Sequence, residues 1–219
     1  MIIVALTDLH GQTGNISRIA DVLVTADVVL LTGDITHFGY KNEAKKVYHE
    51  IAAFNRSILA VSGNCDNSAV TRFLYEQDCS VQNEIRQING YSFTGLGGSL
   101  PCPGKTPTEY SEEEYGLFIS SLKIKSIPES QNILVSHQPP VNTINDEVGS
   151  GKHVGSKIIR EFIEWLQPLV VFTGHIHEGV GIDKIGKTRI INPGPFFDGG
   201  YAYSRILDSQ IVDLEIRKV

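Results

Sequence analysis

The sequence is poor in the features that mark several classes of protein. Its 219 residues include three cysteines, Cys65, Cys79 and Cys102, which are odd in number and lack zinc-finger spacing. We therefore expect no disulfide framework and a reduced, cytoplasmic setting. No apolar run approaches the length of a membrane span, and the apolar N-terminus, Met1 to Leu6, is too short for a signal peptide. No membrane partner is expected.

Basic residues are also scarce. Lys and Arg number 19 against 25 Asp and Glu, which gives a net charge of −6. Non-specific binding to nucleic acid needs a basic face, so we do not expect it here. Because the chain as a whole is acidic, the positive charge that binds an anionic substrate would have to come from a local source at the site. The sequence has no internal repeat, low-complexity tract or linker, and we expect one domain over residues 1–219.

The first third of the chain alternates short apolar runs with helical periodicity. The runs 2–6, 28–31 and 58–61 are typical of buried strands, and the segments 16–25, 41–54 and 68–76 are typical of helices. Asn15 is the expected cap of the first helix, and Asp66 or Asn67 that of the third. This alternation predicts parallel strands with functional groups at their carboxyl ends.

The later sequence predicts antiparallel additions. Asn89-Gly90 separates runs over 81–88 and 91–94 and indicates a hairpin, and a second hairpin is expected over 180–191 around Gly186. Further elements are a helix over 112–124 begun by a Ser111 capping box, strands over 133–135 and 169–172, a helix over 156–166, long loops over 97–108 and 138–155, and strands over 202–207 and 210–217. The fold class is therefore α/β, with mixed sheets and helices outside them.

Polar side chains follow five of the predicted strands at the point where each ends. Two pairs, Asp8 with His10 and His175 with His177, stand at i and i+2, so both members can face the same point in an extended segment. The other three strand ends carry Asp34, Asn64 and His137. Carboxylate, imidazole and amide donors suit Mn²⁺, Fe²⁺, Zn²⁺ or Co²⁺. Seven donors exceed the need of one tetrahedral zinc ion and fit two metals that share a bridging carboxylate.

These motifs, in this order, resemble those of the calcineurin-like metallophosphoesterases. The family pattern is Asp-x-His, Gly-Asp, Gly-Asn-His-Asp/Glu, a lone His, and Gly-His-x-His. This chain carries Asp8-Leu9-His10, Gly33-Asp34, Gly63-Asn64-Cys65-Asp66, His137 and Gly174-His175-Ile176-His177. The segment from His153 to Glu178 further resembles the Icc-related subgroup of predicted phosphoesterases.

The resemblance implies a fold and a set of roles. The fold is a four-layer α/β/β/α sandwich of two packed sheets flanked by helices. Asp8, His10 and His177 would hold one divalent metal, and Asn64, His137 and His175 the other. Asp34 would bridge them, and Asp34, Asn64 and His175 form the expected catalytic set. Mn²⁺ is the favoured metal, with Fe, Zn, Co and Ni as alternatives. Two such metals activate a water for in-line attack on a phosphate ester.

One position departs from the family pattern. The residue after Asn64 is usually His, which resembles a helper of the leaving group, and here it is Cys65. Some small phosphodiesterases of the family also carry Cys there, so activity is still expected. A general acid contributes about 10²–10⁴-fold, so its loss should favour substrates with good leaving groups. A role for Cys65 as a soft metal ligand is the alternative.

Several other residues have open assignments. His37 and His153 are candidates for the substrate rim, with a structural or solvated role as the alternative. His49 is expected on a helix surface, and Asp66 is expected to be structural. Lys105, Arg72 and Lys152 are candidate phosphate contacts that sequence alone does not separate from ordinary surface charge.

The function that these features favour is a metal-dependent phosphoesterase that hydrolyses phosphodiesters through a binuclear centre. Its partner would be a small phosphate-ester substrate. A nucleotide monoesterase or pyrophosphatase is the alternative within enzymes, and a non-catalytic interaction module on the same fold is the alternative outside them. The physiological substrate, the native metal and the oligomeric state stay open.

Overall fold

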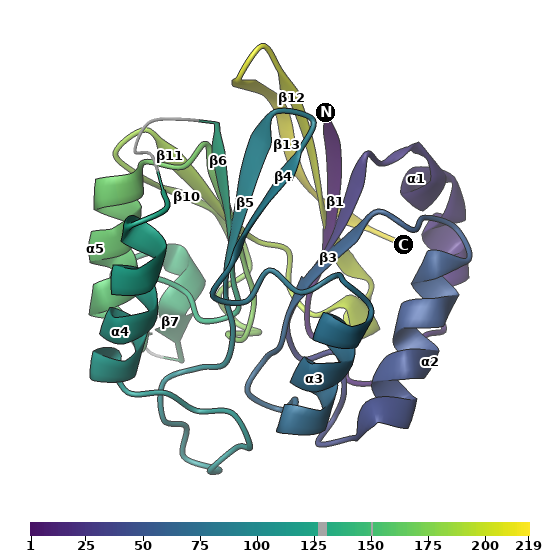
Figure 1. Ribbon diagram of the computed structural model, residues 1–219, viewed down its shortest axis with the longest axis horizontal. Helices are drawn as coiled ribbons and strands as arrows, with labels where there is room; N and C mark the ends of the chain where they lie inside the picture. The colour runs from purple at the N-terminus through teal and green to yellow at the C-terminus, as the bar shows by residue number, and fades with distance from the viewer. Residues whose placement is uncertain (127–130, 150) are drawn as a thin grey trace.

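Two β-sheets pack face to face in the centre of the molecule, and helices cover their outer faces (Figure 1). The computed structural model describes residues 1–126, 131–149 and 151–219. Helices α1 to α3 lie outside the sheet that contains the N-terminal strand, and α4 and α5 lie outside the other sheet (Figure 1). The expected four-layer α/β/β/α sandwich is confirmed.

The first sheet has five strands in the order β13-β12-β1-β2-β3. Its parallel core is formed by β1 (Ile2–Leu6), β2 (Val28–Thr32) and β3 (Ile58–Val61). The long C-terminal hairpin of β12 (Gly200–Leu207) and β13 (Gln210–Lys218) pairs antiparallel with β1. The covering helices are α1 (Ala20–Thr25), α2 (Lys41–Ala52) and α3 (Ser68–Glu76). The expected parallel pairing at the start of the chain is therefore present.

The second sheet has six strands in the order β10-β11-β9-β6-β5-β4. Its parallel core consists of β5 (Tyr91–Leu96), β6 (Asn132–Ser136) and β9 (Val170–Thr173). Next to β9 lies β11 (Thr188–Asn192), which runs parallel to it and forms the predicted hairpin with β10 (Gly181–Ile185). At the other edge, β4 (Ile85–Ile88) pairs with β5. Helices α4 (Glu112–Lys123) and α5 (Lys157–Leu166) cover this sheet.

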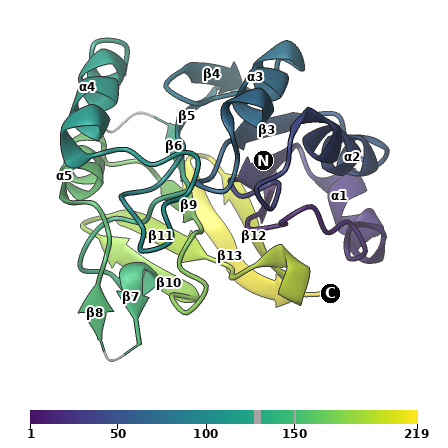
Figure 2. The same ribbon diagram turned by 90° about the horizontal axis from the view of Figure 1, so that it is seen from below.

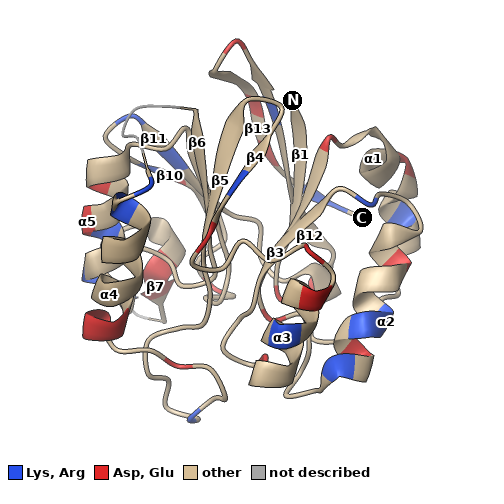
Figure 3. Ribbon diagram, viewed as in Figure 1, with Lys and Arg blue, Asp and Glu red and all other residues tan. Residues whose placement is uncertain are grey.

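The apolar residues form three layers that hold the sandwich together. The first lies between α1–α3 and the first sheet, the second between the two sheets, and the third between the second sheet and α4–α5. The parallel strands are buried on both faces, so their sequences are continuous apolar runs rather than alternating ones. Charged residues lie mainly on the helices, turns and outer strands (Figure 3).

Two helix starts in the third layer are joined through one glutamate. Ser111 and Glu114 form the predicted capping box of α4. Ser156 caps α5, and its hydroxyl donates to the Glu112 carboxylate at 2.6 Å. The same carboxylate accepts from the Lys157 N–H at 2.8 Å. A carboxylate at a helix N-terminus stabilises the exposed N–H groups there. This contact anchors the segment that enters α5.

Four expectations about local structure were wrong, and the first three concern a strand, a loop and a helix cap. The strand expected over 81–88 is only β4, because Asn83 has a positive φ of 57° that interrupts extended backbone. The loop over 138–155, of which Ser150 lies outside the described residues, contains a short hairpin of β7 (Glu147–Val148) and β8 (Lys152–His153). Asn15 does not cap a helix through its side chain; its amide donates to the carbonyls of Phe196 and Phe197.

The region expected as one helix over 16–25 is also divided. A 3-10 turn, Ile16–Ile19, precedes the short helix α1. Among the described residues, no helix has the length and apolar character needed to cross a bilayer.

Candidate metal centre

The seven residues that follow strand ends in the sequence lie at one end of the two sheets. The loop after β1 supplies Asp8 and His10, and the loops after β2 and β3 supply Asp34 and Asn64. From the second sheet, His137 follows β6, and His175 and His177 follow β9. Figure 2 views the molecule from this end. Parallel strands bring their carboxyl ends to the same edge, which is why residues far apart in the sequence converge here.

One group of candidate ligands comes from the first and last motifs. Ligand atoms of Asp8, His10 and His177 all lie within 4.8 Å of one another. The Asp8 Oδ1 atom is 3.3 Å from His177 Nε2. These are the three residues that the resemblance to the metallophosphoesterases assigns to one metal.

Asp34 lies between candidate ligands from the two sheets. Its Oδ2 is 3.8 Å from His10 Nε2, and its Oδ1 is 3.4 Å from His137 Nε2. Ligand atoms of Asp8, Asp34 and His137 also lie within 4.8 Å of one another. A carboxylate with one oxygen directed to each side has the arrangement required of a bridging ligand.

The hydrogen bonding of His137 distinguishes its two ring nitrogens. Its Nδ1 lies 2.8 Å from the Thr32 carbonyl oxygen, which can only accept, so Nδ1 carries the proton. Its Nε2 then faces Asn64 Oδ1 at 3.0 Å and Asp34 Oδ1 at 3.4 Å. Imidazole, carboxylate and amide-oxygen donors gathered in one buried cluster are ligand types of divalent transition metals. The donor set therefore fits divalent metal ions.

The backbone around these ligands is locally strained. Asp8, His10, Asp34 and His175 all have positive φ, between 47° and 67°. Asp and His adopt this conformation more readily than most residues, and clusters of such residues are typical of functional sites.

Close packing of the loops depends on two glycines. A Cβ at Gly63 would overlap the Asp34 carboxylate, and a Cβ at Gly174 would overlap the Thr7 side chain. The glycines of the Gly-Asn and Gly-His motifs are thus required by the approach of neighbouring strand ends.

Burial shapes the protonation of the acidic and histidine groups. Burial tends to raise the pKa of Asp8, but its hydrogen bond with His177 and the nearby histidines hold it below the ordinary value. Burial raises the pKa of Asp34; His137 opposes this rise and Asp8 adds to it. Burial lowers the pKa of His10, and that of His175 to about 3. Neutral imidazole is the form that binds metals.

Asp66 supports the site without entering it. Its buried carboxylate accepts from the Ile35 N–H at 3.0 Å, the Thr36 N–H at 2.8 Å and the Gly63 N–H at 2.9 Å. It therefore ties the loop after β2 to the loop after β3. The expectation of a structural role agrees with these contacts, but the helix cap is Asn67, whose side chain accepts from the Ala69 N–H.

Two cysteines lie at the centre. The Cys65 N–H donates to Asp34 Oδ1 at 2.8 Å, and ligand atoms of Cys65, His10 and Asp34 lie within 4.8 Å of one another. Burial, together with the Asp34 charge, raises the pKa of the Cys65 thiol. Cys102 was not singled out in the sequence, yet its Sγ lies 3.6 Å from His175 Nε2. No local motif marks Cys102, because its relation to His175 is created only by folding.

Five of the seven candidate ligands line a cleft of about 820 Å³. Of the two expected rim histidines, His37 lines this cleft and lies against His10, with 3.4 Å between their Nδ1 atoms. His153 is not among the lining residues; its Nδ1 lies 2.8 Å from the buried Asp146 carboxylate. The hydrogen bond from His153 to Asp146 raises the pKa of His153. Its contact with Asp146 favours the structural alternative for His153.

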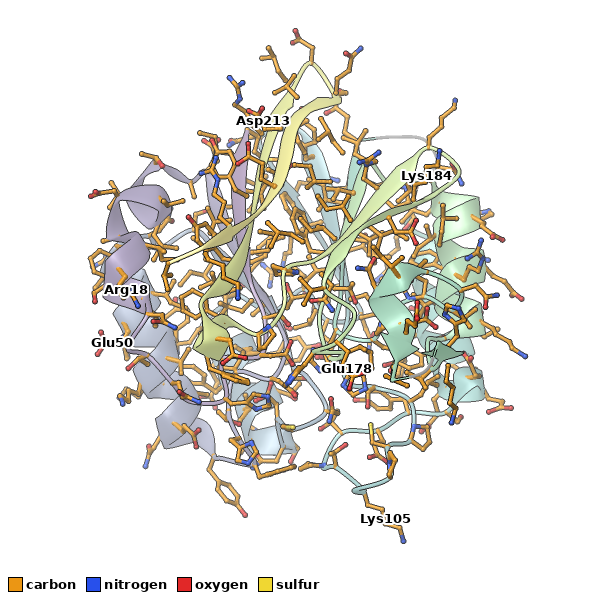
Figure 4. The ribbon with its side chains drawn as sticks, turned by 180° about the vertical axis from the view of Figure 1, so that it is seen from behind. Arg18, Glu50, Lys105, Glu178, Lys184 and Asp213 are labelled. Carbon is orange, nitrogen blue, oxygen red and sulfur yellow. The ribbon has the colours of Figure 1, made fainter. Side chains whose placement is uncertain are left out.

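The three candidate phosphate contacts, Lys105, Arg72 and Lys152, lie in different parts of the structure. Lys152 lines the cleft, whereas Arg72 lines a different groove beside α3. Lys105 stands at the tip of the 97–108 loop and points away from the molecule (Figure 4). Lys152 is the one Lys or Arg lining the cleft within the described parts of the chain.

Comparison with known proteins identifies the family. The family model described as calcineurin-like phosphoesterase matches residues 1–179. The chain belongs to this family. As a calcineurin-like phosphoesterase it is a metal-dependent hydrolase of phosphate esters, and its cluster of Asp and His residues can bind metal.

Relatives span all three domains of life. An uncharacterised protein of Methanocaldococcus jannaschii, MJ1162, is 41% identical, with 89% of this chain and 88% of that protein covered. Human metallophosphoesterase domain-containing protein 1 is 26% identical, over 86% of this chain and 64% of its own length. A probable glycerophosphodiester phosphodiesterase, GpdQ, of Arcobacter nitrofigilis is 24% identical, over 78% of this chain and 64% of its own length.

Solved structures share the fold at low identity. TT1561 of Thermus thermophilus superposes with a TM-score of 0.75 at 18% identity, over 99% of this chain and 98% of that one. A dimetal phosphatase from Danio rerio gives a TM-score of 0.66 at 10% identity, over 95% and 93% of the two chains.

Proposed function

We propose that this calcineurin-like phosphoesterase is a phosphodiesterase with a binuclear metal centre. Asp8, His10 and His177 would hold one metal, Asn64, His137 and His175 the other, and Asp34 would bridge them. The observation that carries this proposal is the position of Asp34, whose two oxygens face His10 and His137 on opposite sides. When bound, the metals would neutralise phosphate charge and supply an activated water.

The protein's own groups would position the reactants. Asp66 fixes the loops that carry Asp34 and Asn64, and the Thr32 carbonyl fixes the tautomer of His137. Such outer contacts orient ligands and raise their basicity. The substrate would enter the cleft above these residues, with His37 at its rim.

The charge of the cleft favours a diester over a monoester. A phosphodiester carries one negative charge near neutral pH, whereas a monoester carries nearly two. Beyond the metals, which would meet part of this charge, Lys152 is the one Lys or Arg among the described lining residues, so little further positive charge is available for the second charge of a monoester. The name of the relative from Arcobacter nitrofigilis, a probable glycerophosphodiester phosphodiesterase, supports the same class.

The test is hydrolysis of bis(4-nitrophenyl) phosphate and 4-nitrophenyl phosphate by metal-stripped protein. Mn²⁺, Zn²⁺ or Mg²⁺ is added back singly, beside a sample without metal. The proposal predicts metal-restored cleavage with a higher kcat/KM for the diester, and loss of cleavage in Asp34→Asn but not in the surface variant Asp21→Asn. A higher kcat/KM for the monoester would favour the monoesterase alternative. Absence of turnover with every metal in a folded protein would favour the interaction module.

A further inference from the structure

The cleft has a polar floor and apolar walls. Five of the seven candidate metal ligands form the floor, namely His10, Asp34, Asn64, His175 and His177. One wall is the segment 100–103, where Leu100, Pro101 and Pro103 line the cleft. The other wall is the β7–β8 hairpin and the residue after it, where Val148 and Val154 line the cleft. Such an apolar lining beside a polar reactive floor is typical of a pocket that holds part of its ligand by apolar burial.

Gln138 connects the two walls. Its side chain is 1% exposed; its Oε1 accepts from the Leu100 N–H at 2.9 Å, and its Nε2 donates to the Val154 carbonyl at 3.2 Å. One buried amide therefore holds both sides of the cleft at a fixed separation. A preformed cleft binds its ligand with a smaller loss of conformational freedom.

The hairpin wall has its own supports. The buried Asp146 carboxylate accepts from the N–H groups of Thr143 and Gly155, each at 2.8 Å, on either side of the hairpin. The Gly149 N–H donates to the Glu178 carboxylate, which joins the hairpin tip to the loop after β9. Val148 and Val154 are therefore carried on a braced segment.

We propose that this cleft selects phosphodiesters whose non-leaving substituent is apolar, with that substituent lying between the 100–103 wall and the β7–β8 hairpin. This inference rests on the proposed function and narrows its substrate class. Sugar-like substituents rich in hydroxyls would find few partners on these walls, whereas an alkyl or aryl group would bury apolar surface. Lys152, at the hairpin edge of the cleft, is available to the single phosphate charge.

The test uses methyl and butyl 4-nitrophenyl phosphate, which share a leaving group and differ only in the length of the alkyl substituent. We expect kcat/KM for the butyl ester to exceed that for the methyl ester by about tenfold or more, since each buried methylene adds to binding. Equal values for the two esters would overturn the proposal while leaving the phosphodiesterase assignment intact.

A binding measurement separates this inference from the proposed function. Calorimetric titration with methyl butylphosphonate and methyl methylphosphonate, which carry one negative charge like a diester, requires no turnover, and we expect tighter binding of the butylphosphonate. Tighter butyl binding without hydrolysis of any ester would retain the apolar subsite and reject the phosphodiesterase. Equal affinities of the two phosphonates would reject the subsite.

Matched variants locate the preference. In Val148→Thr/Val154→Thr the β-branched shape is kept and a hydroxyl replaces a methyl group on the hairpin wall. We expect the ratio of butyl to methyl kcat/KM to fall by about threefold or more, because the added hydroxyls weaken apolar burial. Val212→Thr on β13 is the control and should leave the ratio unchanged. If circular dichroism shows that the double variant is folded and the ratio is unchanged, the hairpin wall is excluded as the source of the preference.

Discussion

The Sγ atom of Cys102 lies 3.6 Å from Nε2 of His175. The two residues are 73 positions apart, and Cys102 belongs to the loop that also forms one wall of the cleft. A partner on one ring nitrogen orients a histidine ring and thereby directs its other nitrogen toward a metal.

Replacing Cys102 should therefore weaken metal binding. We expect Cys102→Val to lower metal affinity by about tenfold, the lower end of the effect of removing an outer contact from a metal ligand. Cys102→Ser keeps a hydrogen-bonding atom and should retain most of the affinity. Competition titration with a chelating dye measures both. Equal affinity in Cys102→Val and the wild-type protein would show that this contact does not orient His175.

Cys65 should make the rate depend strongly on the leaving group. It occupies the position where the family pattern has His, and burial and the Asp34 charge disfavour its thiolate. We expect the wild-type protein to cleave an aryl diester much faster than a dialkyl diester. Cys65→His would restore general-acid catalysis, so we expect it to lower the ratio of these two rates by about tenfold or more. The measurement is kcat on both esters. Equal rates in the wild-type protein would mean that another group supplies the proton.

Asp66 should contribute strongly to stability. It is fully buried and accepts hydrogen bonds from Ile35, Thr36 and Gly63. Asp66→Ala leaves these buried donors unpaired, so we expect a loss of about 3 kcal/mol in the free energy of unfolding. Denaturant titration measures the loss, with the exposed Asp21→Ala as control. A loss no larger than that of the control would contradict the bracing role.

His153 should titrate above its ordinary pKa of 6.5, because its Nδ1 is hydrogen bonded to Asp146. A histidine with a raised folded pKa stabilises the fold fully below its unfolded pKa, and this contribution is lost as pH rises through the folded pKa. The stabilisation from His153 is therefore lost over a pH range that begins near 6.5 and extends upward. NMR titration of the ring should place its pKa above 6.5, and Asp146→Asn should lower it. A His153 pKa at or below 6.5 would contradict the contact.

The strand-end motifs were predictable because each strand before them is marked by a short apolar run in the local sequence. The apolar runs 2–6, 28–31 and 58–61 mark buried parallel strands, and parallel strands end at one edge of a sheet. The convergence of Asp8, Asp34 and Asn64 follows from that topology. The roles of these residues as metal ligands stay a prediction, as does the single domain.

The parts that sequence did not reveal depend on distant contacts. Asn15 bonds carbonyls 181 and 182 positions away instead of capping its own helix. The two-residue strands β7 and β8 are too short to show periodicity, and a buried Asp146 holds them in place. Cys102 acquires its relation to His175 only when β5 and β9 assemble on either side of β6 in the second sheet.

The central claim is a binuclear centre bridged by Asp34, and metal stoichiometry tests it most directly. Metal-stripped protein is titrated with Mn²⁺ by calorimetry, and the bound metal is counted by elemental analysis. We predict two equivalents in the wild-type protein and in Asp21→Asn, and fewer than two in folded Asp34→Asn at the same free Mn²⁺. One equivalent in the wild-type protein, or two in Asp34→Asn with undiminished affinity, would contradict the account.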